Sequence, residues 1–148
     1  MANSGVLSQS TIIYLCTTKS MNRHQNCDEL NGIGVARLNL ELQGIVKIRG
    51  LDSFTNVTHL QLNNNNIEVV EGLNKLAKLE SIDLSFNKIK KAAGFEGLFA
   101  LKQIVISHNE LTSIANSFDH LQRLEILALN SNRLMDVEEV LRCIFESA

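Results

Sequence analysis

One apolar pattern recurs along most of the chain at a nearly constant period of about 22 residues, a length typical of repeat proteins. Each copy has apolar residues at its first, fourth, sixth and eleventh positions, and Asn stands at the ninth position of all copies but the first, which has Gln43 there. The copies begin at Val35, Val57, Leu79, Leu101 and Leu124, so the last copy starts one position later than the period requires. Because a chain with such a period folds as stacked copies of one unit, the pattern predicts a solenoid.

The spacing L-x-x-L-x-L-x-x-N-x-L resembles that of leucine-rich repeats. Leu60 and Leu62 alternate with Gln61 and Asn63, which predicts a short strand with leucines inside and polar residues outside. The Asn amide carries a donor and an acceptor, so a stack of them can satisfy backbone groups at each turn. We therefore expect an α/β fold: a right-handed leucine-rich-repeat solenoid of about five repeats, with short parallel strands on the concave face and helical caps.

The return side of each copy is predicted to turn through glycine, since the chain contains no proline. Gly50, Gly72 and Gly94 recur at the same period as the apolar pattern, and Asn116 stands next in the series. Gly, and after it Asn, adopts positive φ most readily. Each copy is therefore expected to contain one left-handed turn on its return side.

Composition limits the class of protein. The 148 residues carry 14 Lys and Arg against 16 Asp and Glu, for a net charge of −2, and 45% are hydrophobic. This balance favours one globular domain and gives little electrostatic attraction for nucleic acid or an anionic membrane. Three widely spaced cysteines and the lack of a secretory or long apolar segment favour the cytoplasm.

Two end segments depart from the repeat. Residues 1–34 are interpreted as an N-terminal cap, with a short helix near residues 8–16, and a lead-in loop. Residues 35–148 are interpreted as repeats with a C-terminal helix, and the whole chain as one domain. Asp136 followed by Glu139 resembles a capping box at the start of that helix. A monomer is expected unless an uncapped C-terminal end self-associates.

The outward side chains of the strands form the surface where we expect a protein partner to bind. Val105, Ile126 and Ala128 place apolar character on a face that should be polar, and exposed apolar clusters mark partner sites. An alternative for Phe86 is that its ring only packs over the turn before Asn87. The predicted partner-binding residues are Arg37, Glu41, His59, Gln61, Asp83, Phe86, Gln103, Val105, His108, Ile126 and Ala128.

Two constellations could carry chemistry instead. His59, Ser81 and Asp83 would lie on adjacent strands and suggest a hydrolytic triad, but an open polar face lacks the buried base and oxyanion donors of such a site. The potential zinc ligands Cys16, His24 and Cys27 have a spacing outside that of common zinc fingers. We therefore expect no enzyme, no catalytic residue, no metal and no cofactor.

The segment Ile67-Glu-Val-Val-Glu-Gly-Leu73 resembles the short-repeat subfamily, which includes a nuclear protein phosphatase regulatory subunit and several axonemal proteins. Residues 10–146 are most similar to the N-terminal repeat domain of dynein axonemal assembly factors, for example in residues 107–111 and 132–136. The leucine-rich subunit of the nexin–dynein regulatory complex is similar in residues 84–87. The resemblance implies a cytoplasmic or ciliary adaptor for assembly or regulation of axonemal dynein. The alternative is a phosphatase regulatory subunit.

Overall fold

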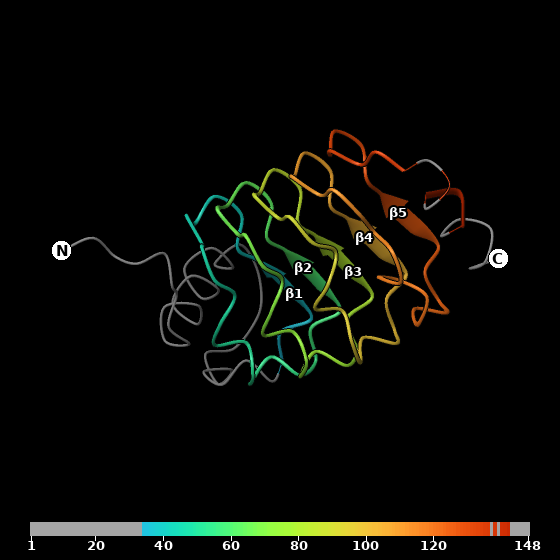
Figure 1. Cartoon of the computed structure of the whole chain (residues 1–148). Helices are drawn as coiled ribbons and strands as arrows, with labels where there is room; N and C mark the ends of the chain where they lie inside the picture. Colours follow the sequence, from blue (N-terminus) through green and yellow to red (C-terminus); the bar gives the residue numbers. More distant parts are fainter. Residues whose placement is uncertain (1–33, 137, 139, 143–148) are drawn as a thin grey trace.

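A computed structural model describes residues 34–136, 138 and 140–142 of the chain. Each copy of the repeat forms one coil and contributes one three-residue strand to a single parallel sheet, in which every strand lies beside the next one in sequence (Figure 1). The strands are β1 (Arg37–Asn39), β2 (His59–Gln61), β3 (Ser81–Asp83), β4 (Gln103–Val105) and β5 (Ile126–Ala128). The predicted solenoid with short parallel strands is confirmed.

The register of the sheet follows the sequence period. Leu60 of β2 pairs with Leu38 of β1 and with Ile82 of β3, which are the residues one period away on either side. Ile104 of β4 pairs with Leu127 of β5, so the additional residue of the fourth coil does not shift the pairing. That residue is accommodated on the return side, because the spacing between equivalent positions first grows by one at Phe118.

The core fills the inside of the coils. The apolar positions of the repeat are almost completely buried from Leu38 to Leu121, and the rings of Phe95 and Phe118 pack at 5.7 Å between centroids. The corresponding side chains of the last coil are only partly buried, namely Leu124, Leu127, Leu129 and Leu134. The solenoid is therefore best packed in its middle coils.

A stack of asparagines, the asparagine ladder, joins each coil to the preceding one. Its members are Asn65, Asn87, Asn109 and Asn132. In the second member, Nδ2 donates to the carbonyl oxygens of Leu62 in the preceding coil and of Leu84 in its own coil, both at 3.0 Å. Oδ1 accepts the backbone N–H of Ile67 at 2.9 Å. The predicted use of both ends of the amide is confirmed.

Left-handed backbone recurs in two series, one in the first four coils and one in all five. The predicted return-side series has positive φ throughout, at Gly50, Gly72, Gly94 and Asn116. A second series, which the sequence analysis did not predict, precedes the ladder position with φ between 54° and 58°, at Leu42, Asn64, Phe86, His108 and Ser131. This second turn directs a different side chain outward from every coil.

The predicted N-terminal cap falls in residues 1–33, outside the described residues. Residues 138 and 140–142 are helical, and Asp136 Oδ1 accepts the backbone N–H of Glu138 at 2.9 Å, as an N-cap does. Glu139 of the predicted capping box is outside the described residues, and the division into domains stays a prediction. No helix in the described part of the chain is long and apolar enough to cross a membrane.

Candidate binding surface

The outward side chains of β1–β5, with the residues that directly follow each strand, make up what we call the strand face. The register places equivalent residues in two rows across the sheet. The first row contains Arg37, His59, Ser81, Gln103 and Ile126, and the second contains Asn39, Gln61, Asp83, Val105 and Ala128. Eight of the eleven predicted partner-binding residues therefore lie side by side, and Glu41, Phe86 and His108 follow the strands.

Apolar side chains gather at the C-terminal end of this face. Ile126 is 51% exposed in the first row. Val105 and Ala128 are register partners in the second row, and both are half-buried. Because residues two apart on a strand point to the same side, the three side chains form one continuous surface.

An exposed aromatic pair lies in the turns that follow β3 and β4. The rings of Phe86 and His108 are stacked, with centroids 4.2 Å apart and planes 7° from parallel. Both residues have φ of 54°, so the same left-handed turn brings their side chains together in adjacent coils. Phe86 remains 51% exposed, so about half of its surface is open to solvent beside this stack. Their separation by one period of the repeat is the sequence signal that could have identified this pair.

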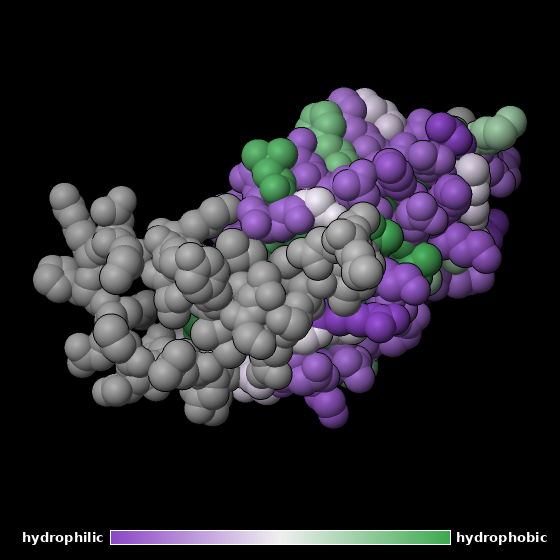
Figure 2. All heavy atoms as spheres, turned by 90° about the vertical axis from the view of Figure 1, so that its left-hand side faces the viewer, coloured by the Kyte–Doolittle hydropathy of each residue, from purple (hydrophilic) through white to green (hydrophobic). Residues whose placement is uncertain are grey.

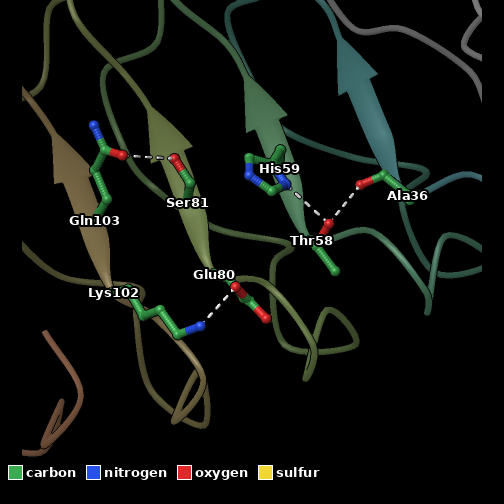
Figure 3. A network of polar contacts seen from close by, with 7 residues as sticks. All are labelled: Ala36, Thr58, His59, Glu80, Ser81, Lys102 and Gln103. Atoms are coloured by element: carbon green, nitrogen blue, oxygen red, sulfur yellow. Dashed lines mark hydrogen bonds and ion pairs between the residues drawn. The ribbon is translucent and has the colours of Figure 1, made fainter.

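The strand face has a polar network on β2 to β4 (Figure 3). The Thr58 hydroxyl donates to the carbonyl oxygen of Ala36 at 3.0 Å and lies 2.9 Å from His59 Nδ1. Since a hydroxyl has a single proton, Nδ1 of His59 is the donor in that second contact. Ser81 Oγ donates to Gln103 Oε1 at 3.4 Å, and the two side chains point toward each other in Figure 3.

The alternative triad is not assembled on this face. His59 is bonded to Thr58 and Ser81 to Gln103, as described above. Asp83 Oδ1 accepts the backbone N–H of Ser85 at 2.9 Å and its hydroxyl at 2.6 Å. No hydrogen bond among the described residues joins His59 to Ser81 or to Asp83. The geometry gives the hydrolytic interpretation no support.

Two serines that come two positions after the second row, Ser85 and Ser107, are buried. Ser85 is 7% exposed and Ser107 is 5% exposed, although the alternation along each strand would turn both side chains outward. The Ser85 hydroxyl donates to Asp83 Oδ1, and the Ser107 hydroxyl donates to Asn130 Oδ1 of the next coil at 2.5 Å. In the third and fourth coils, this serine therefore bonds within the protein and offers little surface to a partner.

Glu80 and Lys102 form an ion pair beside the network, with Nζ donating to the carboxylate at 2.9 Å. The hydrogen bond and the positive charge of Lys102 lower the pKa of Glu80 below its ordinary value of 4.5. A carboxylate with a lowered folded-state pKa contributes stability above its unfolded-state pKa. That contribution is lost as the pH falls through the folded-state pKa.

In the Lys102→Met variant, we expect the pKa of Glu80 to rise toward 4.5, because both principal causes of its lowering are removed. An NMR titration of the Glu80 carboxyl carbon measures this change. Lys75→Met removes an exposed charge elsewhere and should leave the pKa of Glu80 as it is. Equal pKa values in the wild type and in Lys102→Met would contradict the assignment.

Metal chemistry finds no support in the part of the chain that the structure describes, where no three His, Cys, Asp or Glu residues are grouped to hold an ion. The potential ligands Cys16, His24 and Cys27 lie outside the described residues. Seen from the side of the first coil, the described surface is mostly hydrophilic, and hydrophobic side chains form separate spots (Figure 2). Polar surface of this kind suits a rim around an apolar contact.

Two family models match the chain. The model described as "Leucine Rich repeats (2 copies)" matches residues 55–97, and the model described as "Leucine rich repeat" matches residues 91–134. These matches contain β2 to β5 and all four members of the asparagine ladder. No curated protein matches the chain.

Solved structures show the same fold. Internalin C2 from Listeria monocytogenes is 22% identical with a TM-score of 0.65, over 72% of this chain and 46% of that one. TLR13 in its complex with ssRNA13 is 26% identical with a TM-score of 0.62, over 72% of this chain and 16% of that one. Internalin InlF from Listeria monocytogenes is 22% identical with a TM-score of 0.51, over 70% of this chain and 36% of that one.

The chain thus spans less than half the length of each of these proteins. Their likeness establishes the architecture, and the two family models establish the repeat type. The observed coils meet both descriptions, with one short parallel strand and one ladder position in each. This chain belongs to the leucine-rich repeat family.

Proposed function

We propose that this chain is a non-enzymatic adaptor that binds a protein partner through its strand face. Leucine-rich repeat proteins generally act in protein–protein interaction, and repeat arrays provide extended binding surfaces. One observation carries the proposal for this chain. It is the exposed apolar cluster, which we define as the Phe86–His108 stack with Val105, Ile126 and Ala128.

The cluster contains an exposed aromatic ring, Phe86, beside the ring of His108. Aromatic residues are enriched where interfaces have their largest energies, and such centres are surrounded by a polar rim that excludes water. On the strand face, that rim would consist of Arg37, Glu41, His59 and Asp83, together with Gln61 beside Asp83 and Gln103 beside Ile126. The partner should therefore present an apolar segment flanked by polar groups.

We further propose that the partner belongs to the assembly or regulation of axonemal dynein, in the cytoplasm or the cilium. The support is the resemblance of residues 10–146 to dynein axonemal assembly factors. The second candidate is regulation of a protein phosphatase. It is favoured by the segment Ile67-Glu-Val-Val-Glu-Gly-Leu73, which the short-repeat subfamily shares with a phosphatase regulatory subunit.

The double variant Val105→Glu/Ile126→Glu should reduce partner binding about thirtyfold or more, because two carboxylates would be buried in the apolar centre of the interface. The measurement is recovery of axonemal dynein chains by the tagged protein from ciliated cells. The control is Val69→Glu/Phe99→Glu, which changes two exposed apolar residues outside the strands. The control should recover as much dynein as the wild type.

Each outcome decides between the alternatives. Equal recovery of dynein by the wild type and by Val105→Glu/Ile126→Glu would place the binding site away from the strand face. Recovery of a phosphatase catalytic subunit instead of dynein, again lost in the strand-face variant, would favour the second candidate. Loss of binding in the control variant alone would indicate that the partner binds on the return side.

A further inference from the structure

A hollow of about 430 Å³ lies on the return side, between the segments 90–96 of the third coil and 112–120 of the fourth. We call it the return-side hollow. It is separate from the strand face, because all of its lining residues belong to the segments that connect one strand to the next. Its volume is in the range of small-molecule sites.

The sequence of the fourth coil departs at this place from that of the preceding coils. At Gly72, an added Cβ would lie 2.6 Å from the carbonyl oxygen of Ile48 in the preceding coil, and at Gly94 it would overlap the carbonyl oxygen of Val70. These two glycines therefore permit close contact between neighbouring coils. The fourth coil has Asn116 in this place, which carries a real Cβ, and it also contains the additional residue.

The lining offers positive charge and hydrogen-bond donors. Lys90 and Lys91 are exposed, and neither forms an ion pair within the described residues. The hydroxyl of Thr112 adds a neutral donor on the opposite coil. Glu96 is the acidic residue of the lining, so the two lysines leave one net positive charge. His120 closes the inner side, with Nε2 3.2 Å from the carbonyl oxygen of Phe95.

We propose that the return-side hollow binds a phosphate monoester, with Lys90 and Lys91 neutralising its charge and Thr112 donating to a phosphate oxygen. A phosphate monoester carries a charge of about −1.5 to −2 at pH 7, which the net positive charge of the lining attracts. Lysine binds phosphate as a point charge and needs no planar geometry. The hollow is much larger than a phosphate group, so it also admits part of the molecule that carries it.

The test is an NMR titration of the chain with phenyl phosphate at low ionic strength. Saturable shifts are expected at the backbone amides of Ala93, Ala115 and Ser117, which line the hollow. Lys90→Ala/Lys91→Ala should weaken binding about tenfold or more, since it removes charge-assisted contacts. Glu96→Gln should tighten binding about twofold to threefold, because it removes a repulsive charge.

The matched control is Lys47→Ala/Lys75→Ala, which removes the same charge from exposed positions of the first and second coils. It should keep the affinity within about twofold, because neither side chain lines the hollow. Equal weakening in the control, or shifts spread over the whole surface, would overturn the proposal. A failure of Glu96→Gln to tighten binding would do so as well.

Two sources of the phosphate are then distinguished by a phosphoserine heptapeptide and by glucose 6-phosphate. Tighter binding of the peptide than of phenyl phosphate supports a phosphorylated protein segment, and tighter binding of the sugar phosphate supports a metabolite. Absence of binding for all three probes overturns the proposal. None of these results depends on the strand face, so the adaptor function and the phosphate site are tested separately.

Discussion

Replacement of Gly94 by alanine should lower the free energy of unfolding by about 3–5 kcal/mol. Two effects add at this position. The residue has φ of 89°, where a Cβ is strained, and the new Cβ would overlap the carbonyl oxygen of Val70 in the preceding coil. Because that oxygen belongs to the backbone, relief requires the third coil to move away from the second. Urea denaturation followed by circular dichroism measures the change.

Gly97→Ala is the matched control for this prediction. Its φ is 81°, close to that of Gly94, but nothing lies within 4 Å of the added Cβ. The free energy of unfolding should therefore fall by only about 1–2 kcal/mol, which is the cost of a Cβ in the left-handed conformation. Equal losses in the two variants would show that backbone strain alone matters and that contact between the coils does not require glycine.

The fold could be predicted from the sequence because each repeat position has one physical task. An apolar residue at the fourth position is buried in every coil from Leu38 to Ile104, and the constant repeat period sets the strand register without further information. The return-side glycines were predictable for the same reason, since only residue types that tolerate positive φ recur there.

The second left-handed series was not predictable from residue type. Its members include Leu42 and Phe86, neither of which is typical of that conformation. The position in the coil requires the turn, and the side chain adapts to it. The Phe86–His108 stack was therefore missed, although both residues were predicted to bind a partner.

The return-side hollow was also only partly predictable from the sequence. Its signals, the additional residue in the fourth coil and Asn116 in the glycine series, are visible in the sequence. Whether an irregular coil bulges, tightens or separates from its neighbour depends on packing between coils, which a pattern in one dimension does not describe. The sequence thus located the irregularity, and the structure shows an open hollow at the same place, with Lys90 and Lys91 in its lining.

Replacement of Asn87 by alanine should lower the free energy of unfolding by about 3–5 kcal/mol, because it leaves several buried backbone groups without their partner. The amide nitrogen donates to the carbonyl oxygens of Leu62 and Leu84, and Oδ1 accepts the N–H of Ile67. Asn87 is only 8% exposed, so water cannot replace these contacts without opening the turn. Equilibrium urea denaturation again provides the measurement.

Gln43→Ala tests whether the ladder asparagine, and not merely an amide at this position, is required. The Gln43 side chain donates to the carbonyl oxygen of Glu41 at 2.7 Å within its own coil and is half-buried. Its loss should therefore cost about 1 kcal/mol. Asn132→Ala should fall between the two, since its amide makes the same contacts but is only partly buried. Similar losses of unfolding free energy at Asn87, Gln43 and Asn132 would contradict this. They would show that the ladder does not stabilise the fold by joining well-buried coils.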